Sequence, residues 1–167
     1  MSEDSMITEE MRRMIGFETP PYVVKVERGD VLRFLEATLE TNPRFTKESW
    51  ARGKGYGGAL LPPIFFCPDP TVAADLAGLA RPRPFQHSLE EGSDWEFHAP
   101  VRVGDALRLT AKIADLYEKQ GSPEMGRILC TVIEVRCTNQ RDELVGIGRS
   151  TTISSERAGR GQEEAVR

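Results

Sequence analysis

Between residues 107 and 153 the sequence alternates between apolar and polar side chains over long runs. In the first run the apolar positions are Leu107, Leu109, Ala111 and Ile113, separated by Arg108, Thr110 and Lys112. A pattern of period two places the apolar side chains on one face of a β-strand, so the run predicts a half-buried strand. The alternation slips by one residue near Ala114, which predicts a β-bulge.

Further strand patterns lie before and after this run. They are expected at residues 22–26, 95–98, 127–137 and 144–153. The segment 127–137 begins with apolar residues on both faces, which is typical of a central strand. Turns at 121–124 and 139–142 separate the long runs, so the strands are expected to pair antiparallel.

Helices are expected mainly between the first strand and the long runs. The helical segments are 8–15, 30–40, 46–51, 62–67 and 72–79. In the last of these, Val72, Leu76 and Leu79 share one face. Helices segregated onto one face of an antiparallel sheet make an α+β fold. We expect one domain at 16–154, an N-terminal extension with a short helix at 1–15, and a disordered tail at 155–167, where arginines and glutamates are interleaved.

The composition is that of an ordinary globular protein. The 167 residues are 39% hydrophobic and 29% charged, and the net charge of −4 argues against a nucleic-acid partner. Cys67, Cys130 and Cys137 lack the spacing of metal ligands, so no metal is expected. An odd cysteine count and no recognisable signal peptide favour a cytoplasmic location, and no stretch approaches the length that spans a membrane.

Residues 38–66 are the expected functional segment. They contain the Asn42-Pro43 turn, four glycines between Gly53 and Gly58, and the restart of a helix at Pro62-Pro63. A long irregular segment inside a compact chain is more often functional than accidental. We therefore expect a binding or catalytic site here.

These motifs resemble the MaoC-like hot-dog dehydratases. The matching pieces are Asn42-Pro43, the loop 55–58, Leu61-Pro-Pro63 and, most specifically, Trp95-Glu-Phe-His-Ala-Pro-Val-Arg-Val-Gly-Asp105. Over residues 16–153 the chain is most similar to the N-terminal-type domain of that family. It also resembles the non-catalytic subunit of mycobacterial (3R)-hydroxyacyl-carrier-protein dehydratases.

The resemblance implies a single hot-dog fold, in which an antiparallel sheet wraps around a central helix, usually paired into a dimer. It also implies reversible hydration of a 2-enoyl thioester in fatty acid metabolism. The thioester is carried on coenzyme A or acyl carrier protein, and no cofactor is implied. The reaction needs a carboxylate and a histidine as base and acid, and a backbone amide that stabilises the thioester oxyanion.

Active family members supply these groups from a segment Asp-x-Asn-Pro-x-His and from a later His-Gly at the start of the central helix. In this chain the aspartate position falls on Glu40, the histidine position on Phe45, and the His-Gly pair on Pro62-Pro63. Phe45 cannot transfer a proton. Pro63 has no N–H, so Ile64 is the alternative amide donor.

The remaining candidates are weaker. Glu40 is either a surviving base or a solvated glutamate at a helix end, and His87, in an expected loop, is the candidate substitute acid. His98 is expected to be structural or to face solvent, because its strand parity is opposite to that of Phe97. The expected substrate-binding residues are Asn42, Phe45, Tyr56, Gly57, Gly58, Pro63 and Ile64. Core packing is the alternative role for the aromatic members.

Three hypotheses follow. The first is a substrate-binding subunit that is catalytically degenerate alone and pairs with a catalytic hot-dog subunit, or with itself, to form a 2-enoyl-thioester hydratase. The second is an autonomous enoyl-CoA hydratase that uses Glu40. The third is a non-enzymatic module that binds acyl thioesters or acts as a scaffold.

Overall fold

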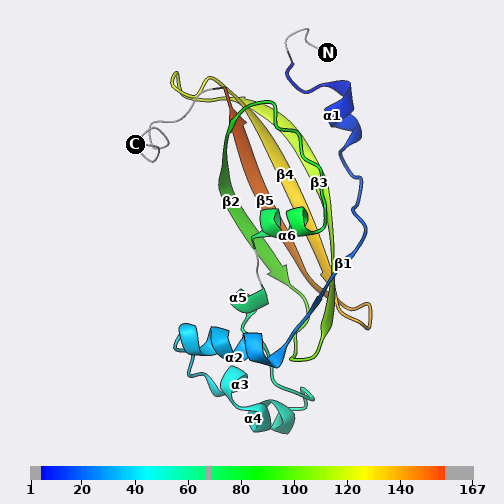
Figure 1. The fold of residues 1–167 in the computed structure, drawn as a ribbon, viewed down its shortest axis with the longest axis vertical. Helices are drawn as coiled ribbons and strands as arrows, with labels where there is room; N and C mark the ends of the chain where they lie inside the picture. The colour runs from blue at the N-terminus through cyan, green and yellow to red at the C-terminus, as the bar shows by residue number, and fades with distance from the viewer. Residues whose placement is uncertain (1–4, 67–68, 157–167) are drawn as a thin grey trace.

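The computed structural model describes residues 5–66 and 69–156 and contains one five-stranded antiparallel sheet (Figure 1). Its strands are β1 (Tyr22–Lys25), β2 (His87–Phe97), β3 (Ala106–Gln120), β4 (Arg127–Thr138) and β5 (Leu144–Ser155). The strand order is β1-β3-β4-β5-β2. β4 is the central strand, and β3 and β5, which contain long alternating runs, lie on either side of it.

The predicted bulge in β3 is confirmed. The pairing of β3 with β4 shifts register between Ile113 and Asp115. Before the shift Leu107, Leu109, Ala111 and Ile113 are buried, as expected for one face of the strand. The extra residue lets the strand bend, which curves the sheet towards the helix that packs on it.

Six helices accompany the sheet in the described part of the chain. They are α1 (Glu9–Arg13), α2 (Arg28–Ala37), α3 (Pro43–Thr46), α4 (Glu48–Gly53), α5 (Pro63–Phe66) and α6 (Pro70–Leu76). Figure 1 shows α6 in front of the sheet, and α2, α3 and α4 gathered at one end of it. The predicted α+β fold with a sheet around a central helix is confirmed, with α6 as that helix.

The predicted buried face of α6 is wrong in part. Ala73 and Ala74 are completely buried against the sheet, whereas Val72 and Leu76 are 50% and 52% exposed. Small side chains let the helix approach the strands closely. The larger apolar residues therefore lie on the opposite face of the helix, away from the sheet.

The N-terminal segment runs beside β3 (Figure 1). Thr8 caps α1 through a hydrogen bond from the Met11 N–H. Further on, the Thr19 N–H donates to the Ala111 carbonyl, and the Ala111 N–H donates to the Thr19 hydroxyl at 3.1 Å. This segment and β1 together cover the β3 edge of the sheet.

The β2 edge differs from the β3 edge. β2 is much longer than the predicted strand at 95–98 and pairs with β5 along its whole length. Within the described residues no strand pairs with its other side. The sheet thus ends in an 11-residue edge strand whose residues are mostly exposed.

Cys130 and Cys137 are buried free cysteines, and burial raises the pKa of Cys137 to about 12. Cys67 and residues 157–167 of the predicted tail lie outside the described residues. No helix among the described residues has the length and apolarity needed to cross a membrane.

Candidate acyl-binding site

A cavity of about 320 Å³ lies where the segment 38–66 meets the end of β2. We call it the histidine cavity. Its lining comes from Arg44 and Phe45 of α3, from Tyr56, from residues 60–63 and from residues 97–101. Its size is at the lower end of the range typical of small-molecule pockets, and its lining is mostly apolar.

The glycine loop reaches this position through unusual backbone conformations. Gly55 and Gly57 have φ angles of 80° and 75°, which side chains other than glycine rarely adopt. Beyond the loop, the Leu61 N–H donates to the Val101 carbonyl, and the Val103 N–H donates to the Ala59 carbonyl, both at 3.0 Å. These bonds hold one wall of the cavity against the strand connection at residues 98–105.

Aromatic stacking fixes Tyr56 at the cavity. The rings of Trp50 and Tyr56 are stacked, with 6.4 Å between their centroids and 11° between their planes. The Arg44 guanidinium lies over the Trp50 ring, 5.9 Å from its centroid. Such cation–π and stacking contacts order the exposed helices α3 and α4.

A second cavity of about 210 Å³ lies on the other side of Phe45. Leu32 and Leu35 of α2 line it together with Gly57 and Gly58 of the loop. Phe45 lines both cavities and packs against the core. The side chain at the expected histidine position therefore lies between the two cavities and transfers no proton.

Glu48 carries a fixed charge in the second cavity. Its carboxylate accepts hydrogen bonds from Arg52 at 2.7 and 3.0 Å and from Arg28 at 3.3 Å. The hydrogen bond and charge of Arg52, followed by those of Arg28, lower the pKa of Glu48. An ionised carboxylate that two guanidinium groups already satisfy is a poor general base.

His98 faces solvent, as predicted, and it also lines the histidine cavity, which the sequence did not predict. β2 ends at Phe97, and the N–H groups of His98 and Ala99 both donate to the Val145 carbonyl, at 2.8 and 3.3 Å. The strand parity no longer applies beyond Phe97, so Phe97 and His98 both reach the cavity. His98 Nε2 lies 3.9 Å from the Glu96 carboxylate, and the imidazole is 40% exposed.

Glu40 and Asn42 form a turn instead of lining either cavity. Glu40 Oε1 accepts a hydrogen bond from the Asn42 N–H at 2.7 Å. Asn42 Oδ1 in turn accepts one from the Arg44 N–H at 3.0 Å and caps α3. Both polar side chains therefore order the chain that carries Phe45 into the site.

Pro63 begins α5 and lines the histidine cavity. Because Pro63 has no N–H, the backbone donor expected at this position is absent. Ile64 follows within α5, but its side chain lies outside what the structure describes. Its proposed amide role stays a prediction.

His87 does not belong to this site. It was expected in a loop, but it is the first residue of β2, and Phe97 is the last. At about 3.3 Å per residue, roughly 33 Å separate the two along the strand. His87 therefore cannot act on a molecule held in the histidine cavity of the same chain.

The histidine cavity has mostly apolar walls and lacks half of an acid–base pair. Its described lining contains one imidazole, one guanidinium and no Asp or Glu. Among the described residues no group of three or more His, Cys, Asp or Glu side chains has the arrangement of a metal site. The sequence pattern located this region through Phe45, Tyr56 and Pro63. The sequence pattern did not predict that Arg44 and His98 line the cavity.

Comparisons with known proteins agree with this description of the fold. A family model described as FAS1-like, dehydratase domain region, matches residues 13–147. No curated protein matches the chain in sequence.

Three solved structures are similar in fold. The HadBC (3R)-hydroxyacyl-ACP dehydratase complex from Mycobacterium tuberculosis is 24% identical with a TM-score of 0.66, over 84% of this chain and 97% of that chain. The ChsH1–ChsH2 complex from the same organism is 15% identical with a TM-score of 0.71, over 92% and 93%. A MaoC-like dehydratase from Rhodospirillum rubrum is 18% identical with a TM-score of 0.60, over 87% and 94%. The chain therefore belongs to the FAS1-like dehydratase-region family, and its fold is the MaoC-like hot-dog fold.

Proposed function

We propose that this chain is the substrate-binding subunit of a 2-enoyl-thioester hydratase or (3R)-hydroxyacyl-thioester dehydratase, completed by a catalytic hot-dog partner. One observation carries the proposal: the histidine cavity has apolar walls and one histidine, but no carboxylate among its described lining residues. Hydration of an enoyl thioester needs both a base for water and an acid for the α-carbon. The substrate is an acyl thioester of coenzyme A or acyl carrier protein.

The two cavities around Phe45 support the binding role. The apolar parts of their walls come from Phe45, Tyr56, Phe97 and aliphatic residues of α2 and of the segment 60–63, and charged residues of α2 and α4 also line the second cavity. Burying an acyl chain there yields roughly 0.8 kcal/mol per methylene group.

The open edge of β2 supports the proposal that a partner subunit binds this chain. An exposed edge strand with unpaired backbone groups is a ready site for a strand of another subunit. Val72 and Leu76 add an exposed apolar pair on α6, the helix that packs on the sheet. A partner that pairs with β2 would extend the sheet and bring its own residues alongside this subunit.

The charge of β2 favours a different subunit over a second copy. The strand contains Glu90, Glu91, Asp94 and Glu96 and no Lys or Arg. Glu91 and Glu96 are paired with Lys119 and Arg149, whereas Asp94 forms no ion pair among the described residues. Antiparallel pairing of two identical β2 strands would set acidic side chains close to one another, which is unfavourable.

The test is to co-express this chain with a hot-dog subunit that carries the complete Asp-x-Asn-Pro-x-His segment, encoded by a neighbouring gene. The complex is expected to hydrate a crotonyl-type thioester, and the isolated chain is not. Activity that the partner subunit shows alone, unchanged by addition of this chain, would contradict the proposal.

A second candidate function, an autonomous hydratase, rests on His98 and Glu96. The imidazole lines the cavity, and the Glu96 carboxylate lies 3.9 Å from it, so the pair could relay a proton. This candidate predicts that the isolated chain is active and that His98→Gln abolishes the activity. His87→Gln is the matched control, because His87 lies at the other end of β2. An isolated chain without activity excludes this candidate. If the complex is inactive as well, only the non-enzymatic binding module remains.

A further inference from the structure

A third cavity, of about 290 Å³, lies on the opposite side of α6 from the glycine loop and separate from the site above. We call it the polar cavity. Its floor is the concave face of the sheet, where Ser88, Thr131, Thr152 and Ser154 come from three neighbouring strands. Hydroxyl groups at positions that face a helix across a sheet are unusual, since apolar residues normally fill that space.

Two guanidinium groups border the polar cavity. The Arg81 side chain is only 7% exposed and is ion-paired with Asp75, which is 51% exposed at the solvent side. A buried guanidinium has five N–H donors, and one carboxylate does not satisfy all of them. Arg83 also lines the cavity and forms no ion pair among the described residues.

Glu90 lines the polar cavity and interacts with Asp69, which caps α6 and does not itself line the cavity. Glu90 accepts a hydrogen bond from Ser150 at 3.1 Å, and the Ser150 and Thr71 hydroxyls are 3.0 Å apart, which ties Glu90 to the start of α6. A hydrogen bond between the protonated Glu90 carboxyl and Asp69, together with burial, raises the pKa of Glu90. Two adjacent carboxyl groups repel each other when both are ionised, so both are ionised only when a cation lies against them.

The charges are separated along the polar cavity. Arg83 lies two residues before Phe85, whose carbonyl accepts a hydrogen bond from Ser154 at 3.4 Å, near the beginning of β2. Glu90 lies further along β2, opposite Thr152. Arg83 thus lies in the loop before β2 and Glu90 lies further along the strand, while the Arg81–Asp75 ion pair also lines the cavity.

We propose that the polar cavity binds a small zwitterion of the α-amino-acid type. Its carboxylate would bind Arg83, and its ammonium group would bind Glu90. Planar guanidinium groups match a carboxylate geometrically, and hydrogen bonds between charged groups are about twice as strong as neutral ones. A volume of about 290 Å³ admits a molecule of a few heavy atoms.

The chemistry of the ligand can be tested with three probes that differ by one group. Alanine carries both charges, propionate only the carboxylate, and ethylamine only the ammonium. Titration of the full chain, followed by calorimetry or by NMR of its amide signals at constant ionic strength, is expected to show saturable binding of alanine. Each single-charge probe is expected to bind about tenfold or more weakly, since it loses one charged hydrogen-bonding partner.

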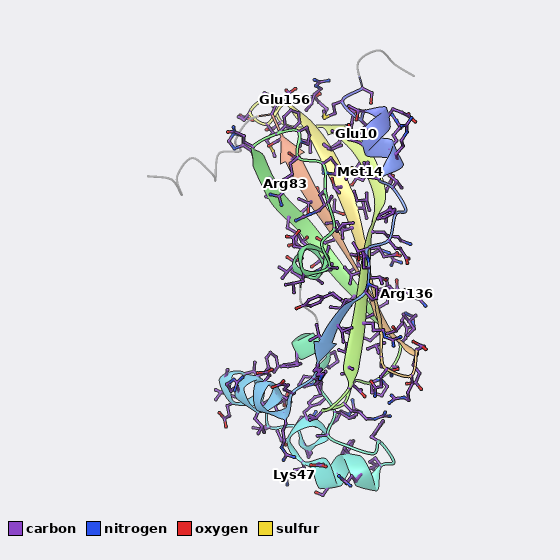
Figure 2. All side chains as sticks on the ribbon, turned by 45° about the vertical axis from the view of Figure 1, so that its right-hand side comes forward. Glu10, Met14, Lys47, Arg83, Arg136 and Glu156 are labelled. Atoms are coloured by element: carbon purple, nitrogen blue, oxygen red, sulfur yellow. The ribbon has the colours of Figure 1, made fainter. Side chains whose placement is uncertain are left out.

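Two variants test whether Glu90 and Arg83 cause these differences in affinity between the probes. Glu90→Gln is expected to bring alanine and propionate to similar affinities, and Arg83→Gln is expected to do the same for alanine and ethylamine. Both side chains are exposed, so neither change threatens the fold. Arg136→Gln is the matched control, and Figure 2 shows Arg83 and Arg136 far apart on the molecule.

The outcomes are distinct from those of the hydratase proposal, which does not use this cavity. Propionate that binds as tightly as alanine would overturn the assignment in favour of a simple anion site. No saturable binding of any probe, or equal losses in Arg136→Gln, would overturn it altogether.

Discussion

The carboxylate of Glu40 accepts a hydrogen bond from the backbone N–H of Asn42, with 2.7 Å between the two atoms. This bond turns the chain at the end of α2 and directs it into α3. Glu40 thus holds the position of the family's catalytic aspartate in sequence, but its carboxylate is engaged with the backbone and does not line the cavities around Phe45.

The first prediction concerns Glu40→Gln. A glutamine oxygen can still accept from the Asn42 N–H, so the variant is expected to lose at most about 1 kcal/mol of unfolding free energy. Hydratase activity of the complex is expected to be unchanged. Urea denaturation and a steady-state assay check both points. Loss of turnover with an intact fold would instead support Glu40 as a base.

The second prediction concerns the contact between Gly148 and Trp95. A Cβ atom at Gly148 would lie 2.6 Å from the Trp95 ring, a separation that real side chains do not show. Gly148→Ala is therefore expected to cost about 1–3 kcal/mol of stability, because the indole must move out of its packed position. The control is Gly92→Ala, whose Cβ would meet nothing within 4 Å. Equal effects of the two substitutions would contradict this account of the packing.

The third prediction concerns pH and a row of ion pairs across the sheet. Glu134 bonds Lys112 at 2.9 Å and Arg149 at 3.0 Å, and Arg149 also bonds Glu96. Burial acts to raise the pKa of Glu134, but the hydrogen bonds from Lys112 and Arg149 outweigh it, and the pKa is lowered from 4.5.

A lowered pKa means that the folded state favours the ionised form of Glu134. The resulting stability is present above the unfolded value near 4.5 and is lost as the pH falls through the lower folded value. The free energy of unfolding of the wild type is expected to exceed that of Glu134→Gln by about 1 kcal/mol at neutral pH. This difference is expected to disappear in acid. Denaturation curves at several pH values measure it. A difference that grows in acid would refute the assignment.

The fourth prediction concerns Asp94 on the open edge of β2. If the partner strand is basic, Asp94→Lys is expected to weaken the heteromeric complex roughly tenfold and to make its salt dependence shallower. The same change is expected to increase self-association, because a lysine would then face the acidic groups of a second β2. Analytical ultracentrifugation measures both.

A control for this charge reversal is Glu10→Lys on α1, at a distance from β2 (Figure 2). It changes the net charge by the same amount and is expected to leave both equilibria unchanged. A complex as sensitive to Glu10→Lys as to Asp94→Lys would mean that overall charge, and not the β2 edge, governs assembly.

The fold was predictable where side-chain periodicity carries the information. The alternation around Leu107 and Ile113 predicted β3, and the slip in this alternation predicted the bulge before Asp115. The first half of β2 was not predictable, because Ser88 to Asp94 is polar and contains Gly92. Pairing with β5 makes it a strand, and such tertiary pairing overrides local propensity.

The site was predictable in position but not in its full composition. Phe45, Tyr56 and Pro63 line the histidine cavity as expected. His98 was not assigned to the cavity, because the strand was assumed to continue beyond Phe97. His87 was assigned to a loop because the length of β2 was not visible in the sequence. Both errors come from the ends of one strand, which sequence patterns locate poorly.

The most direct test of the central claim compares turnover of a 2-enoyl thioester by this chain, by its hot-dog partner and by the purified complex. The substrate-binding account predicts hydration by the complex at an ordinary enzymatic rate, with the isolated chain at least roughly 100-fold slower, since it lacks a general base. Hydration by the isolated chain at the rate of the complex would contradict it.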